Sequence, residues 1–284
     1  MRIEFDNIKK TKRILCLSAF LIIACINNSQ AQSKQQQDSL MLRSLFDKAL
    51  TSNRVGPDLF YLTKKIGARI SGSENAGKAV EWAKAKMEEI HPDKVYLQEV
   101  MVPHWERGAK ESSSFKAKNG KEVLMSVSAL GGSVDTHGIL KAQVVEVRSW
   151  AELDSLGVAG VAGKFVFFNR AMDPREIETF KAYLAAADQR GRGAIEAAKK
   201  GAVGALVRSL TLSIDDFPHT GAMSYAADVK KIPAAALSTK SADLLSAELK
   251  RNPALLYSLQ MNCVQLPDVK SYNVIGEITG SKYP

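Results

Sequence analysis

Two short apolar runs decide the fold: residues 163–169 read GKFVFFN and residues 201–208 read GAVGALVR. Both runs are rich in Phe, Val, Leu and Ala and begin at glycine, a combination that is typical of buried strands. Helical patterns over Pro174–Ala187 and Gly193–Lys200 lie between them. This mixture of buried strands and helices predicts an α/β fold.

Further strands and helices extend from these runs in both directions. We expect helices over Ser39–Leu50, from Pro57 to Ile66, about Ser73–Ile90, Ser149–Leu156 and Ser241–Arg251. We expect strands over Lys94–Trp105, Ser112–Lys118, Lys121–Ser126, Ile139–Arg148, Ile232–Leu237, Ala254–Leu266 and Ser271–Thr279. Asn119-Gly120 is a strong hairpin signal. Ser71 and Glu74 have capping-box spacing, and Ser241 is the expected cap of the last helix.

The 284 residues have an ordinary globular composition, with 45% hydrophobic and 24% charged residues, which argues against wholesale disorder. The formal net charge is +9, and part of this excess lies in the first 31 residues. The rest is spread thinly, whereas surfaces that bind nucleic acids concentrate their positive charge. We therefore expect no nucleic-acid partner.

Residues 1–31 have the order of a secretory signal peptide. A basic patch at Lys9–Arg13 precedes the uncharged apolar run Ile14–Ile26, and Ser29-Gln30-Ala31 forms a cleavage site. The apolar run is shorter than the roughly 20 residues that span a bilayer. A bacterial lipoprotein is the alternative, because residues 22–25 read IIAC. We expect export, periplasmic or extracellular, with a membrane tether only if Cys25 is lipidated.

Local motifs identify no active site. Cys263 is the single cysteine beyond the signal segment, so cleavage after Ala31 leaves neither an intramolecular disulfide nor a cysteine-based zinc site. The sequence contains no Gly-x-Ser-x-Gly nucleophile elbow. No HxxxH or HExxH pattern surrounds any of the four histidines, which are His91, His104, His137 and His219. His91 and Asp93 have His-x-Asp spacing, but His91 precedes Pro92 at an expected helix end, where a surface or capping histidine is the expected role.

A series of short motifs stands in one order along the chain. They are residues 67–75 (GARISGSEN), 79–82 (AVEW), 102–108 (VPHWERG), 163–169 (GKFVFFN), 201–206 (GAVGAL), 213–221 (SIDDFPHTG) and 231–236 (KIPAAA). Together they resemble the N-terminal part of the carboxypeptidase Q (plasma glutamate carboxypeptidase) group of dinuclear-zinc exopeptidases. The resemblance covers about Asp38–Gly280.

The resemblance implies an incomplete zinc-exopeptidase α/β domain that is interrupted by a protease-associated domain, a mixed β-sheet with helices. It places the N-terminal part of the peptidase domain at 38–128, the protease-associated domain at 129–266, and a strand returning to the peptidase domain at 267–284. Segment 129–266 carries its own apolar strands, so we expect it to fold independently.

In that group, two zinc ions share a bridging carboxylate and activate a water, and a glutamate is the general base. The first ligands are a His-x-Asp pair that follows a strand beyond the one resembled by Tyr272–Gly280. No catalytic or zinc-binding residue can therefore be transferred to this chain. We expect a truncated product, partial gene or fragment that is inactive alone and holds no catalytic zinc.

Two classes of function remain open. The first is a secreted zinc exopeptidase, of carboxypeptidase or aminopeptidase type, of which this chain is the N-terminal half. The second is a non-catalytic protease-associated module that binds a substrate or a partner. A peptide is the expected partner, and a homodimer is left open as an assembly.

The loop Ser213–Met223 is the candidate for contact with substrate. It is rich in turn residues, and exposed loops often carry functional residues. Its PHTG segment resembles the family motif, and a histidine there can donate a hydrogen bond to a peptide carboxylate. His219, Thr220 and Gly221 are therefore candidate substrate-cleft residues, with a structural or solvated histidine as the competing interpretation.

Overall fold

The computed structural model describes residues 34–281, which divide into two compact units at Gly67/Ala68. The first unit contains a helix over residues 34–51, α2 (Val55–Phe60) and the π-helix η1 (Tyr61–Ile66). Gly67 ends η1 with a φ of 82°, a conformation that favours glycine. The signal peptide predicted at 1–31 lies outside the described residues.

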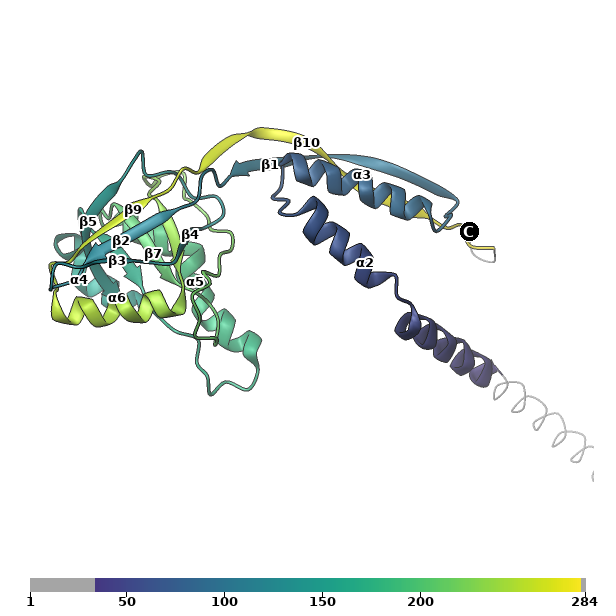
Figure 1. Cartoon of the computed structure of the whole chain (residues 1–284), viewed down its shortest axis with the longest axis horizontal. Helices are drawn as coiled ribbons and strands as arrows, with labels where there is room; N and C mark the ends of the chain where they lie inside the picture. Colours follow the sequence, from purple (N-terminus) through teal and green to yellow (C-terminus); the bar gives the residue numbers. More distant parts are fainter. Residues whose placement is uncertain (1–33, 282–284) are drawn as a thin grey trace, which may run out of the picture. The chain divides into compact units, whose positions relative to one another are not determined.

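The second unit begins with α3 (Glu74–Glu88) and a two-stranded antiparallel ribbon, in which β1 (Lys94–Glu106) pairs with β10 (Val264–Glu277) (Figure 1). The break predicted between the strands 254–266 and 271–279 is therefore absent, and the chain is interrupted instead at 261–263, between a strand over Leu256–Gln260 and β10. The cap of α3 also differs from the prediction, because Ser73 rather than Ser71 accepts the capping hydrogen bond.

The main body of the second unit is an eight-stranded mixed sheet in the order β3-β2-β9-β5-β6-β7-β8-β4. The predicted Asn119-Gly120 hairpin joins β2 to β3. The strands are β2 (Ser112–Lys116), β3 (Glu122–Leu124), β4 (Val127–Ala129), β5 (Leu140–Val147), β6 (Phe165–Phe168), β7 (Gly204–Arg208), β8 (Ala234–Leu237) and β9 (Leu256–Gln260).

Strands β5, β6, β7 and β8 are parallel neighbours and form the centre of the sheet. The side chains of β6 alternate between two hydrophobic layers, as the pleat of a strand requires. Phe165 and Phe167 join one cluster, whereas Val166 and Phe168 join the other. The apolar run that predicted a buried strand is therefore buried on both faces.

Helices cover both faces of the parallel strands. α6 (Thr239–Arg251) packs Leu245 and Leu249 into the cluster that contains Phe165. α4 (Trp150–Val161) and α5 (Thr179–Lys199) pack on the opposite face. This arrangement gives three layers, with the sheet between α6 and the α4–α5 pair, and it confirms the α/β prediction.

The helices predicted at 174–187 and 193–200 form the single helix α5. Gly193 lies inside it, where an added Cβ would approach the Phe168 ring to 2.9 Å. Glycine thus allows α5 to lie close to β6, which outweighs its low intrinsic helix propensity. The local pattern indicated a break because it contains no information about this tertiary contact.

The sheet also crosses the boundary predicted at 128/129. Strands β2 and β3 come from the 38–128 segment and β4 straddles the boundary, yet β2 pairs with β9 and β4 pairs with β8. Phe115 and Met125 are buried in the same cluster as Phe165. The sheet body therefore begins near Glu111, because its antiparallel edge needs these early strands to cover its core.

Among residues 34–281, no helix has the length and apolar character required to cross a lipid bilayer.

Candidate functional site

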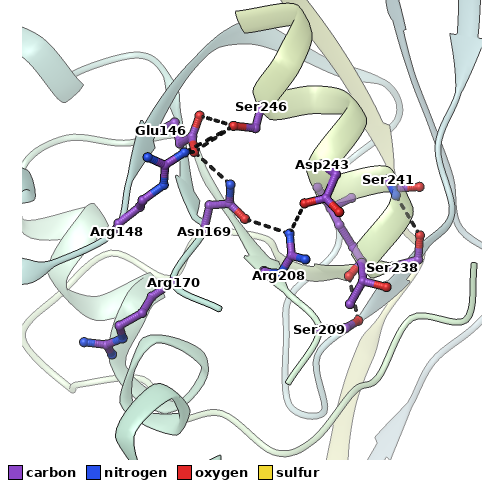
Figure 2. A network of polar contacts seen from close by, with 12 residues as sticks. Glu146, Arg148, Asn169, Arg170, Arg208, Ser209, Ser238, Ser241, Asp243 and Ser246 are labelled. Atoms are coloured by element: carbon purple, nitrogen blue, oxygen red, sulfur yellow. Dashed lines mark hydrogen bonds and ion pairs between the residues drawn. The ribbon is translucent and has the colours of Figure 1, made fainter. Parts of the chain in front are cut away.

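Polar side chains gather where the four parallel strands end. The carboxyl ends of parallel strands lie at one edge of a sheet, and ligands of open α/β sheets bind outside that edge. Figure 2 shows the network at this edge. Its members at the strand ends are Glu146 and Arg148 at β5, Asn169 after β6, Arg208 at β7 and Ser238 after β8.

Glu146 links β5 to its neighbours. Its Oε1 atom accepts hydrogen bonds from Asn169 Nδ2 at 2.8 Å and from Arg148 Nη2 at 2.7 Å. The hydroxyl of Ser246, on α6, donates to Oε2 at 2.9 Å. Only 16% of the Glu146 side chain is exposed, so these three donors replace much of the water around its charge.

Arg208 is the corresponding cation at β7. Its side chain is 9% exposed, and Nη1 lies 2.5 Å from the Asp243 carboxylate on α6. The same nitrogen donates to Asn169 Oδ1 at 3.3 Å. Asn169 therefore bridges the two ion pairs, because its amide donates to Glu146 and its carbonyl accepts from Arg208.

The charges of this network balance within the protein. Glu146 pairs with Arg148, and Arg208 pairs with Asp243. Both carboxylates are occupied by donors, which suits them to fixing α6 against β5, β6 and β7 rather than to removing a proton from a substrate. The network thus fixes α6 and the carboxyl ends of these strands relative to one another.

The candidate loop 213–223 is anchored at this same edge by three hydroxyls. Ser209 Oγ accepts from the His219 N–H at 2.7 Å, and Thr239 Oγ1 accepts from the Asp215 N–H at 2.9 Å. Ser238 Oγ, which also caps α6, donates to the Asp216 carboxylate at 3.2 Å. The backbone of the loop is therefore held to β7 and the start of α6.

The three predicted site residues have different environments. The His219 side chain is exposed and Thr220 is half-buried. Gly221 is half-buried, and its carbonyl accepts from the Gly131 N–H at 2.9 Å. A Cβ at Gly221 would lie 2.7 Å from Cζ of Arg190. Gly221 is thus explained by packing, whereas His219 is the member of this group that is available to a ligand.

Two of the other three histidines lie beside a carboxylate. His104 Nε2 lies 3.2 Å from Glu106, and His137 Nδ1 lies 3.0 Å from Asp135. His91 follows α3 with a φ of 51°. These positions agree with the structural or solvated roles expected from the sequence.

The described residues do not form the zinc site that the family resemblance implies. Within 34–281, no group of three or more His, Cys, Asp or Glu side chains is arranged to hold a metal ion. Cys263 is buried and free, and burial raises the pKa of its thiol to about 11. A thiol with so high a pKa is predominantly protonated near neutral pH and is therefore a poor nucleophile.

The network at the strand ends was absent from the sequence prediction. A signal for part of it was present, because Asn169 and Arg208 are polar residues placed directly at the ends of buried apolar runs. On α6, Asp243, the partner of Arg208, and Ser246, the partner of Glu146, follow an ordinary helical pattern. Only the packing of α6 on the sheet shows that they face these strand ends.

The sequence is similar to curated peptidases over most of its length. It is 39% identical over 247 residues to carboxypeptidase Q of Xenopus laevis, a match that covers 85% of this chain and 50% of the relative. The chain is homologous to carboxypeptidase Q. The bovine protein is 34% identical over 248 residues, covering 87% of this chain and 49% of the relative. No family model matches the sequence.

A solved structure supports the same relationship. The peptidase M28 precursor from Shewanella amazonensis SB2B superposes with a TM-score of 0.80 at 35% identity. The match covers 87% of this chain and 55% of that structure. The chain therefore has the α/β fold found in a peptidase M28 protein, and it spans about half the length of the curated relatives of carboxypeptidase Q.

Proposed function

We propose that this chain contributes the N-terminal half of an exported zinc exopeptidase that removes terminal residues from small peptides. The observation that carries the proposal is 39% identity to carboxypeptidase Q across 85% of the chain. Zinc is proposed from the family resemblance, in which two ions polarise the scissile carbonyl and activate water. The preference for the carboxyl or amino terminus of the peptide is left open.

The proposed role of this chain is to shape the substrate cleft. Support comes from the loop 213–223, whose backbone is held by Ser209 and Thr239 while the His219 ring is exposed. A fixed backbone with an exposed ring places a hydrogen-bond donor at low entropic cost. Phe217, with 74% of its surface exposed, adds an apolar contact beside it.

We also propose that this chain alone does not hydrolyse peptides. Activation of water by zinc needs about three protein ligands in one small volume, and within residues 34–281 no group of three or more His, Cys, Asp or Glu side chains is arranged to hold a metal ion. Metal content and dipeptide hydrolysis of the purified chain test this directly. Two equivalents of tightly bound zinc together with turnover would overturn it.

A chimera tests the proposed activity. Residues 38–280 replace the matching segment of the Shewanella peptidase M28 precursor, and hydrolysis of a dipeptide panel is measured with and without a zinc chelator. We expect chelator-sensitive hydrolysis by the chimera. A chimera that folds and binds zinc but hydrolyses none of the substrates hydrolysed by the parent would contradict the proposal.

The same chimera tests the candidate loop. We expect His219→Ala to raise KM and to leave the unfolding midpoint unchanged, because the ring contacts substrate and the loop is held through the backbone N–H of residue 219. His137→Ala is the matched control, since its side chain is 90% exposed. Equal KM values for the two variants would show that the His219 ring does not contact the substrate.

A non-catalytic binding module is the second candidate function. It is favoured by the sheet body itself, which buries two hydrophobic clusters on opposite faces of one sheet and so has its own core. A chimera that is inactive while the isolated chain binds peptide would favour this candidate over the first.

A further inference from the structure

The antiparallel half of the sheet has one open face. On β2 and β9, Phe115, Tyr257 and Leu259 are buried in the cluster beneath α6. Successive side chains of a strand point to opposite faces, so their neighbours lie on the other face, where α4 and α5 pack against the parallel strands. These neighbours are exposed or half-buried, and they are Ser112, Ser114, Lys116, Leu256, Ser258 and Gln260.

A groove follows this open face. It consists of two adjoining hollows with volumes of about 540 Å³ and 240 Å³. Both are lined by Ser114, Glu122, Lys141 and Ser258, so they form one continuous depression. The larger hollow is within the range of roughly 300–1,000 Å³ that is usual for ligand sites.

Three lysines line the larger hollow: Lys116, Lys118 and Lys141. We refer to the whole depression as the lysine groove. In the described part of the chain, none of these ammonium groups has an ion-pair partner. The acidic residue of the groove is Glu122, whose carboxylate already accepts a hydrogen bond of 2.9 Å from Ser114. Three cations against one anion leave the groove positive.

The register of the strands fixes the spacing of these charges. Ser258 on β9 lies opposite Ser114 on β2 and opposite Lys141 on β5. Lys116 is two residues beyond Ser114 on β2. Two strand spacings across the sheet and two residues along it separate the Cα atoms of Lys116 and Lys141 by about 12 Å.

The third lysine is placed by a buried contact. The backbone N–H of Lys118 donates to the Glu248 carboxylate on α6 at 2.8 Å, and Glu248 is only 6% exposed. This bond holds the end of β2 and directs the chain into the Asn119-Gly120 turn. The rim of the groove is therefore part of the rigid sheet body rather than a free loop.

We propose that the lysine groove binds an acidic peptide segment in an extended conformation. The three ammonium groups attract carboxylates. Between them the Ser258 hydroxyl can donate a hydrogen bond, and Ser114 Oγ, whose proton is donated to Glu122, can accept one from a peptide N–H. Alternate side chains of an extended peptide lie about 7 Å apart, so acidic residues two or four apart can reach lysines on different strands. A single small dicarboxylate does not cover this span. The proposal stands independently of peptidase activity.

A binding measurement on the full chain tests this proposal. The probe is a fluorescent pentaglutamate peptide, acetylated and amidated so that its termini carry no charge, and the readout is fluorescence anisotropy at low ionic strength. We expect saturable binding. The triple variant Lys116→Gln, Lys118→Gln, Lys141→Gln should weaken it at least tenfold, because it removes every cation of the groove.

A control triple variant separates this site from general attraction to a basic protein. Lys230→Gln, Lys231→Gln, Lys240→Gln removes the same charge from exposed positions elsewhere, and it should change the affinity less than threefold. Equal weakening by the two triple variants would overturn the proposal, as would equal binding of pentaglutamine. If citrate at the same carboxylate concentration displaces the pentaglutamate probe, the groove binds free polycarboxylates. That result would also overturn the proposal that its ligand is a peptide.

Discussion

The Arg208 guanidinium at the end of β7 lies 2.5 Å from the Asp243 carboxylate on α6. Arg208 is almost buried, whereas Asp243 is 55% exposed. The Arg208 guanidinium is therefore largely shielded from water, whereas the Asp243 carboxylate keeps much of its hydration shell. Loss of the exposed partner should affect stability mainly through the buried cation that remains.

Asp243→Asn should accordingly destabilise the sheet body. We expect the free energy of unfolding to fall by about 1–2 kcal/mol, because Arg208 keeps a neutral acceptor but loses its counter-charge. Urea unfolding at pH 7 measures the change. Asp228→Asn, at an exposed position, is the control and should be nearly neutral. An Asp243→Asn protein as stable as the unmodified chain would show that the ion pair contributes little.

Glu111 predicts a pH dependence of stability. Burial alone would raise the pKa of Glu111, but hydrogen bonds from the Ala129 N–H and the Arg107 guanidinium outweigh it and hold the pKa below its usual value. A lowered folded-state pKa stabilises the protein above the unfolded pKa, and this contribution is lost as the pH falls through the folded-state value.

The measurement compares the unmodified chain with Glu111→Gln. We expect the unmodified chain to be more stable at pH 7, and the difference should shrink below about pH 5, where the unfolded carboxyl begins to bind protons. Urea midpoints at pH 7, 5, 4 and 3 follow the effect. A gap that stays constant across this range would mean that the charge of Glu111 is not responsible.

Gly108 joins β1 to the sheet body in a conformation that favours glycine. Its φ is 75°, and an added Cβ would lie 2.2 Å from the Asn262 carbonyl oxygen. Gly108→Ala therefore combines backbone strain of about 1–2 kcal/mol with a clash against backbone. Gly120 has a similar φ of 81° with open space around it, so Gly120→Ala isolates the strain. Thermal unfolding should show the larger loss for Gly108→Ala, and equal losses would argue against the clash.

The position of the boundary predicts which fragment folds. A 109–263 fragment keeps β2, β3 and β4 and should unfold cooperatively in urea. The 129–266 fragment lacks Phe115 and Met125, which are buried in the core, and loss of one buried Phe alone costs about 3–5 kcal/mol. We expect it to be much less stable or molten. Equal urea midpoints for the two fragments would show that the independently folding unit begins at residue 129, as the sequence predicted.

Export is testable at the N-terminus. The order of basic patch, apolar run and Ser29-Gln30-Ala31 predicts that the exported protein begins at Gln32. N-terminal sequencing of the protein from the extracellular or periplasmic fraction provides the measurement. Acylated Cys25 would establish the lipoprotein alternative, and an intact N-terminus in the cytoplasm would exclude both.

The sequence by itself predicted the elements whose causes are local. The apolar run at Phe165–Phe168, the Asn119-Gly120 hairpin and the strand at Leu140–Val147 were all expected close to where they occur. Period, composition and turn chemistry are enough for such elements, because each depends on residues within a few positions. The resemblance to carboxypeptidase Q was also visible in short consecutive motifs.

Tertiary structure alone decided the features that join distant segments. The continuity of α5 depends on Gly193 against Phe168, and the extent of the sheet depends on β2 pairing with β9. For the candidate site, the sequence suggested the loop with His219, which stays a prediction, and gave no sign of the pairing of Arg208 with Asp243. Contacts between residues far apart in the chain leave no local period in the sequence, so only the packed sheet and helices reveal them.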